Sequence, residues 1–161
     1  MADSPAMPEA GAKAPPFFGT TQDGKTISLA DFKGKKVALY FYPRDNTPGC
    51  TKQACNLRDN FEELRKHNIH VVGVSDDPQD SHRRFADSYN LPFPLLADVD
   101  RSILNSYGTY GQKNLYGRVS MGTKRTTFLI DEEGMIVKVY KRPKTNSHAS
   151  EILKGFGVGE E

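Results

Sequence analysis

Residues 37–55 read VALYFYPRDNTPGCTKQAC, and this stretch decides the fold. Its first six residues, 37–42, are all apolar or aromatic, which predicts a buried strand. Thr47 is a residue type that caps helix N-termini, and Pro48 suits the first position of a helix. The stretch therefore predicts a buried strand that leads through a short loop into a helix beginning at Pro48.

Both cysteines of the chain lie in this predicted helix. Cys50 falls in the first turn, where unpaired backbone N–H groups and the positive end of the helix dipole favour a thiolate. Cys55 lies about 140° around the helix from Cys50. The apolar residues of the helix share the face of Cys50, and they are Ala54, Leu57, Phe61 and Leu64. The predicted helix therefore buries the first sulfur against the core and turns the second away from it.

The spacing of the two cysteines constrains how they can react with each other. Residues five positions apart in an intact helix have Cα atoms about 8.6 Å apart. A disulfide needs a Cα separation of roughly 4.4–6.8 Å. Cys50 and Cys55 can therefore bond only if the first turn of the helix unwinds. The pair predicts one reactive sulfur and a second sulfur that resolves it.

The rest of the chain alternates strand and helix patterns. The loop at 108–124 is long for a compact domain, and we expect it to border a site. The element order predicts an α/β fold with a central mixed sheet flanked by helices. Strands are predicted at 26–29, 36–42, 69–75, 95–97, 126–130 and 135–141, and helices at 48–66, 77–90, 100–107 and 147–154.

Length and composition set the class of protein. The chain has 161 residues, which suits one domain, and a formal net charge of +2 with both signs interspersed. No basic run predicts a nucleic-acid partner, and no stretch reaches the ~18 apolar residues that predict a membrane span. The Ala- and Pro-rich start lacks the apolar core of a secretory signal, so we expect a flexible tail at 1–16 and a domain at 17–161. Two cysteines without such a signal predict a reducing compartment, the cytoplasm, or an organelle if the chain begins at a processing site.

The motif around Cys50 resembles a known signature. Pro43, Thr47 and Cys50 form a P-x-x-x-T-x-x-C pattern that resembles the active-site motif of peroxiredoxins. The string TPGCTKQAC at 47–55 resembles the bacterioferritin comigratory, or Q, subfamily, and Arg125 in KRTTFLIDEEG matches a second motif of that family. This resemblance implies a thioredoxin-like fold and an enzyme that reduces hydrogen peroxide and organic hydroperoxides by thiol chemistry.

The resemblance extends over residues 14–156 and has one departure within the first motif. Gln53 stands where many relatives have an acid. Because Gln53 precedes the second cysteine, we expect this departure to leave the peroxide step unaffected. An arm that carries a distant third cysteine is absent from the sequence, so we expect a monomer.

The resemblance also implies a role for each site residue. Cys50 attacks peroxide and becomes a sulfenic acid, which Cys55 converts to a disulfide. Arg125 supplies fixed positive charge, the Thr47 hydroxyl orients the peroxide, and Pro43 shields the sulfur from water. Thioredoxin or a similar dithiol then reduces the disulfide. No cofactor and no metal is implied.

Other interpretations of the cysteines remain open. They could be inert core residues, or they could bind zinc, although the C-x4-C spacing has no histidine nearby. The four histidines share no ligand spacing and are expected at the surface or in the core; they are His67, His70, His82 and His148. A second function class is a thiol–disulfide oxidoreductase or a redox-regulated binding protein on the same fold. Such exchange proteins usually carry C-x-x-C and prefer disulfide substrates to peroxide.

Overall fold

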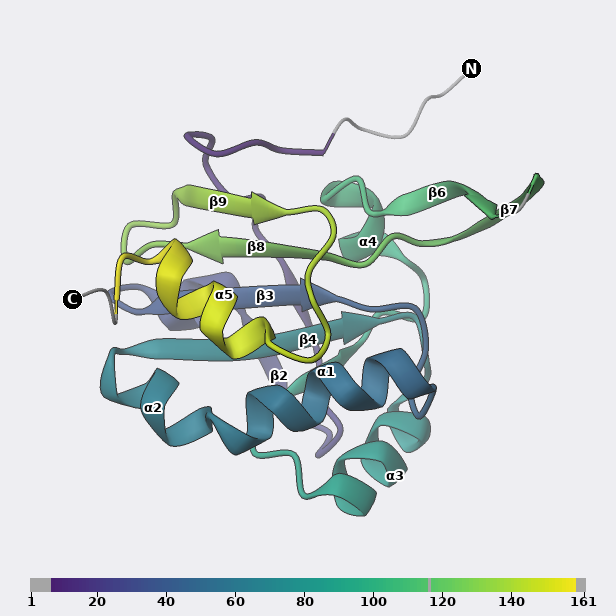
Figure 1. Cartoon of the computed structure of the whole chain (residues 1–161), viewed down its shortest axis with the longest axis horizontal. Coiled ribbons are helices and arrows are strands. Elements are labelled where there is room, and N and C mark those ends of the chain that lie inside the picture. Colours follow the sequence, from purple (N-terminus) through teal and green to yellow (C-terminus); the bar gives the residue numbers. More distant parts are fainter. Residues whose placement is uncertain (1–6, 116, 159–161) are drawn as a thin grey trace.

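The computed structural model describes residues 7–115 and 117–158. A five-stranded sheet in the order β5-β4-β3-β8-β9 forms the centre of the molecule (Figure 1). β3 pairs in parallel with β4 and antiparallel with β8, so the sheet is mixed, as predicted. Its strands are β3 (Lys36–Phe41), β4 (Ile69–Ser75), β5 (Leu95–Ala97), β8 (Thr126–Ile130) and β9 (Ile136–Tyr140).

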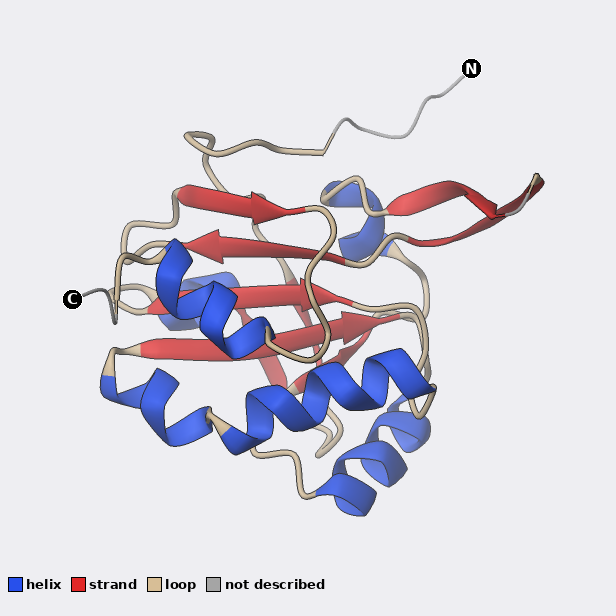
Figure 2. Cartoon of the chain, in the orientation of Figure 1, coloured by secondary structure: helices blue, strands red, loops and turns tan. Residues whose placement is uncertain are grey.

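Helices cover both faces of this sheet (Figure 2). One face packs against α1 (Pro48–Asp59), α2 (Phe61–Lys66), α3 (Gln79–Tyr89) and α5 (His148–Gly155). The other face packs against α4 (Ser102–Ser106), a 3-10 helix (Leu29–Phe32) and the small hairpin of β1 (Phe18–Thr20) and β2 (Thr26–Ser28). In the described part of the chain, no helix has the length and apolar character needed to cross a membrane.

β3 is the strand that carries the site loop, and it is buried on both faces. Its side chains alternate between the two cores, with Ala38 and Tyr40 on the α1 side and Leu39 and Phe41 on the α4 side. On the neighbouring strand, a Cβ at Gly73 would lie 2.9 Å from the Leu95 side chain and 3.0 Å from the Tyr40 ring, so a larger residue there would require these side chains to shift. The well-packed end of β3 therefore gives the following loop a fixed starting point.

The predicted helix at 48–66 is wrong in one respect, because it is two helices. α1 ends at Asp59 and α2 begins at Phe61, with Asn60 between them at φ −110° and ψ 15°. The Asn60 side-chain amide donates to the Asn56 carbonyl at 2.8 Å. Asparagine bonds readily to nearby backbone in this way, which interrupts regular helix bonding.

The predicted long loop at 108–124 is also wrong, because most of it is a hairpin. β6 (Tyr110–Leu115) pairs antiparallel with β7 (Arg118–Thr123), and the hairpin extends away from the central sheet (Figure 1). Residues 117–121 are all exposed, so no buried face imposes the alternating pattern by which a strand is recognised. The base of β7 leads directly to Arg125.

Part of the predicted tail at 1–16 makes hydrogen bonds to the domain. The Ile136 N–H donates to the Ala12 carbonyl at 2.8 Å, and the Ala14 N–H donates to the Gly134 carbonyl at 2.9 Å. Ala14 is buried, and Pro15 accepts a hydrogen bond from the Tyr107 hydroxyl at 2.7 Å. β9 is an edge strand, and its free backbone groups pair with this segment despite its tail-like composition. Residues 1–6 of the predicted tail lie outside the described residues.

His148, at the start of α5, is a buried histidine with two partners. Its Nε2 lies 2.8 Å from the Thr127 hydroxyl, and its Nδ1 lies 2.8 Å from a Glu151 carboxylate oxygen. Burial lowers the pKa of His148, and this effect outweighs the opposing one of Glu151. The contact with Glu151 is therefore a hydrogen bond from a neutral ring rather than an ion pair.

We expect His148 to make the protein less stable in mild acid. The unfolded chain protonates a histidine below about pH 6.5, whereas the folded chain keeps this ring neutral to lower pH. The contribution is therefore fully present above about pH 6.5 and declines by up to ~1.4 kcal/mol per pH unit below it, until the folded ring also titrates. Urea unfolding of wild type and His148→Gln at about pH 7.5 and about pH 5 measures how the free energy of unfolding changes with pH. Wild type should lose stability more steeply, and equal slopes would contradict the assignment.

Candidate active site

The loop from β3 to α1 places Thr47 at the N-terminus of the helix, as predicted. The Thr47 carbonyl accepts the Thr51 N–H at 2.8 Å, and Pro48 occupies the first helical position. The hydroxyl of Thr47 makes no capping bond and donates instead to the Arg44 carbonyl at 2.9 Å. Pro43 and Thr47 are both half-buried. The first backbone N–H groups of α1 therefore remain available to a ligand.

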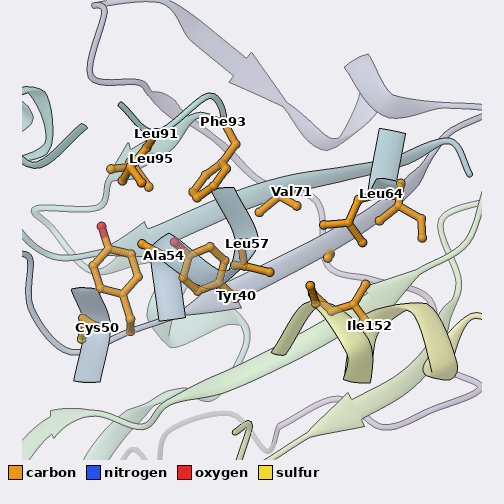
Figure 3. Packing of buried hydrophobic residues seen from close by; sticks show 14 of the residues in the cluster. Tyr40, Cys50, Ala54, Leu57, Leu64, Val71, Leu91, Phe93, Leu95 and Ile152 are labelled. Atoms are coloured by element: carbon orange, nitrogen blue, oxygen red, sulfur yellow. The ribbon is translucent and has the colours of Figure 1, made fainter. Parts of the chain in front are cut away.

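Cys50 lies in the first turn of α1, as predicted, and it is only 1% exposed. Figure 3 shows it at one end of the apolar cluster, followed along α1 by Ala54 and Leu57. An Arg125 Nη2–H donates to the Cys50 sulfur at 3.3 Å, and both cysteines are free thiols. The sulfur thus faces the positive end of a helix and a guanidinium, which together stabilise a thiolate.

Arg125 reaches the first turn of α1 from the segment between β7 and β8. The preceding Lys124 N–H donates to the Thr109 carbonyl at 2.6 Å, which fixes the base of the hairpin. A Cβ at Gly49 would lie 3.2 Å from Arg125 Nη2, so this glycine permits the close approach of the guanidinium. The structure therefore brings together Cys50 and Arg125, which are 75 positions apart in the sequence.

Gln53 also belongs to the site, through a contact that the sequence motif did not reveal. Its side chain is fully buried, and its Oε1 accepts the second guanidinium bond, from Arg125 Nη1, at 2.6 Å. Gln53 follows Cys50 by three positions, so both face the same side of α1. That spacing was the signal that could have identified it. A neutral amide orients the guanidinium without neutralising its charge, so the charge stays available to the Cys50 sulfur.

Tyr40, on β3, lies in the same core cluster as Cys50 (Figure 3). Burial raises the pKa of its phenol well above the usual range, and the nearby Cys50 sulfur raises it further. Its hydroxyl makes no hydrogen bond among the described residues. The Tyr40 phenol is therefore uncharged at physiological pH, and it packs in the same cluster as Cys50.

Cys55 is half-exposed and lies in the same uninterrupted helix as Cys50. Helix geometry sets the two Cα atoms about 8.6 Å apart, beyond the reach of a disulfide. The next residue, Asn56, ties α1 to α5: its Oδ1 accepts the Ala149 N–H at 2.8 Å, and its Nδ2 donates to the Asn146 carbonyl at 3.2 Å. The C-terminal half of α1 is therefore anchored to α5 and to the segment before it.

Comparison with known proteins agrees with this site. The model of the AhpC/TSA family matches residues 10–139. A bcp-type peroxiredoxin of Coxiella burnetii is 48% identical over 145 residues, which cover 90% of this chain and 96% of that protein. The crystal structure of peroxidoxin BcpB from Mycobacterium tuberculosis has a TM-score of 0.83 at 30% identity, covering 97% of this chain and 100% of that one.

A structure of the Xanthomonas campestris bacterioferritin comigratory protein, described for its alkyl peroxide reduction activity, is also similar. It has a TM-score of 0.84 at 28% identity and covers 92% of this chain and 98% of that one. These matches confirm the thioredoxin-like fold and the resemblance drawn from the Cys50 motif. The chain belongs to the AhpC/TSA family and is a peroxiredoxin of the bacterioferritin comigratory group, a thiol-dependent peroxidase.

Proposed function

We propose that Cys50 is the sulfur that attacks peroxide. The observation that carries this proposal is the 3.3 Å hydrogen bond from Arg125 to a buried sulfur at a helix N-terminus. The Cys50 thiolate donates an electron pair to one peroxide oxygen, and the O–O bond breaks. The sulfur is oxidised to a sulfenic acid, and the other oxygen takes a proton and leaves as water or an alcohol.

The neighbours of Cys50 have matching roles in this step. The Arg125 guanidinium stabilises the negative charge that passes from the Cys50 sulfur to the leaving oxygen. The free N–H groups of the first turn of α1 add donors for the peroxide. The Thr47 hydroxyl can rotate to accept from one peroxide oxygen and donate to the other. Pro43 has no N–H and closes the loop over the sulfur.

Cys55 is the proposed resolving sulfur. Its thiolate attacks the sulfenic sulfur of Cys50, a disulfide forms, and the hydroxyl leaves as water after taking a proton. The first turns of α1 must unwind for this step because the intact helix holds the two Cα atoms too far apart. A dithiol such as thioredoxin then reduces the disulfide, which the half-exposed position of Cys55 makes accessible.

The proposed substrates are hydrogen peroxide and alkyl hydroperoxides, since the similar Xanthomonas campestris protein is described for alkyl peroxide reduction. The competing hypothesis is thiol–disulfide exchange. A stopped-flow experiment separates the two: reduced protein is mixed with hydrogen peroxide, with cumene hydroperoxide or with oxidised glutathione at equal concentration, and the products are identified by mass. We expect oxidation by the peroxides to be much faster, with an intramolecular disulfide as product. Faster oxidation by glutathione disulfide would favour the exchange protein.

A further inference from the structure

Asp45 lies in the middle of the site loop, between Pro43 and Thr47, and its side chain is only 3% exposed. Its Oδ1 accepts the Tyr42 hydroxyl at 2.6 Å. Its Oδ2 accepts the Ser81 hydroxyl at 2.8 Å and lies 2.7 Å from His82 Nδ1. The P-x-x-x-T-x-x-C pattern treats this position as free, but the structure gives its carboxylate three partners.

His82, on α3, is fully buried. Its hydrogen-bond partners indicate which of its ring nitrogens carry a hydrogen. Its Nε2 lies 2.9 Å from the Leu96 carbonyl, which can only accept, so Nε2 carries a hydrogen. The 2.7 Å contact between Nδ1 and Asp45 Oδ2 also requires a proton between them. The pair therefore shares one buried proton, and it connects the site loop to α3 and to β5.

The backbone of the loop is held at the same point. The Asp45 N–H donates to Asp77 Oδ2 at 2.7 Å, and that oxygen also accepts the Ser75 hydroxyl at 2.9 Å. The following residue, Asn46, has a left-handed φ of +62°, a conformation that surrounding contacts must support. Two sets of hydrogen bonds thus fix the loop immediately before Thr47.

The arrangement of Asp45, Asp77 and His82 also resembles a cation site, since their ligand atoms lie within 4.8 Å of one another. Asp45 Oδ2, Asp77 Oδ2 and His82 Nδ1 are each already engaged in a hydrogen bond. The cluster is therefore a closed hydrogen-bond network that holds the loop.

We propose that Asp45 and His82 are positioning residues for peroxide reduction. Neither side chain hydrogen-bonds to the Cys50 sulfur. Both act by fixing the loop that places the Thr47 hydroxyl and the first N–H groups of α1 around that sulfur. This inference rests on the proposed role of Cys50. Misplacing such donors by about 1 Å is enough to lower a rate by ~10²-fold.

The test compares two reactions of the same sulfur in Asp45→Asn and His82→Gln, both in a Cys55→Ser background. Hydrogen peroxide needs the positioned donors, whereas iodoacetamide needs only the thiolate. We expect the rate of sulfenic acid formation to fall by ~10–100-fold while the alkylation rate stays nearly unchanged. Parallel losses in both rates, or unchanged peroxide rates in folded variants, would overturn the proposal.

Asp98→Asn is the matched control for loss of a buried carboxylate. Asp98 is 3% exposed, and it accepts the Ile103 and Leu104 N–H groups of α4 instead of holding the site loop. The Asp98→Asn variant should have lower thermal stability but no selective loss of the rate of oxidation by peroxide. If Asp45→Asn does not fold, Tyr42→Phe keeps the volume, removes one bond to Asp45 and should give a smaller loss of the same kind. A wild-type Cys50 that peroxide does not oxidise overturns the proposed function and this inference together.

Discussion

We expect Cys50→Ser to abolish peroxide consumption, whereas Cys55→Ser should still react once per molecule and stop at the sulfenic acid. Cys50 is buried in the first turn of α1 and accepts a hydrogen bond from Arg125, whereas Cys55 is partly exposed in the middle of the helix. A serine hydroxyl at position 50 is far less nucleophilic than a thiolate. The measurement mixes each reduced variant with excess hydrogen peroxide without a reductant, and follows peroxide loss and protein mass.

The double variant Cys50→Ser/Cys55→Ser is the control for oxidation elsewhere, such as at methionine. Wild type should stop at an intramolecular disulfide under the same conditions, because Cys55 traps the sulfenic acid before further oxidation. A result in which Cys50→Ser keeps the first oxidation and Cys55→Ser loses it would reverse the assignment of the two sulfurs.

We expect Arg125→Met to slow oxidation of Cys50 by ~10²–10³-fold, the usual effect of removing a donor to a developing negative charge. Methionine keeps an apolar stem of similar length and removes the contacts to Cys50 and Gln53. Lysine at position 125 keeps a positive charge but lacks the planar guanidinium with its several N–H donors. Arg125→Lys should therefore react at a rate between those of wild type and Arg125→Met. Stopped-flow kinetics in the Cys55→Ser background measure the first oxidation alone.

Lys124→Met is the matched control for Arg125→Met, because Lys124 is the exposed cation next in sequence and does not hydrogen-bond to the Cys50 sulfur. It should react at the wild-type rate. Gln53→Ala should lie between the two, since Arg125 keeps its charge but loses the partner that orients it. If Arg125→Met reacted as fast as Lys124→Met, the guanidinium would have no role in the peroxide step.

The centre of the fold could be predicted because it is determined by local patterns. The apolar run of β3 is buried on both faces, and Thr47-Pro48 starts α1 where the pattern placed it. The errors lie where a single side-chain hydrogen bond or a tertiary contact decides the structure. Asn60 divides the helix through its own side chain, and the segment at 11–14 is ordered only because β9 offers it an unpaired edge.

The site could be predicted in part for a similar reason. Cys50 and Cys55 were found from one motif, and Arg125 was connected to them only by resemblance to a family. Asp45 and His82 are 37 positions apart, and each looks like an ordinary loop or helix residue until the fold brings them together. A polar residue that acts through a distant partner leaves no local periodicity from which it can be recognised.

The central claim is that Cys50 is oxidised first and that Cys55 reaches it only when the start of α1 opens. The Cα atoms must approach by roughly 2 Å relative to an intact helix. Hydrogen exchange of the amides from Cys50 to Leu57, measured for reduced and disulfide-bonded protein, tests this most directly. The account predicts faster exchange after oxidation in the turns before Asn56, with unchanged protection in α5 as the internal control. Equal protection of α1 in the two states, with the Cys50–Cys55 disulfide confirmed by mass, would contradict it.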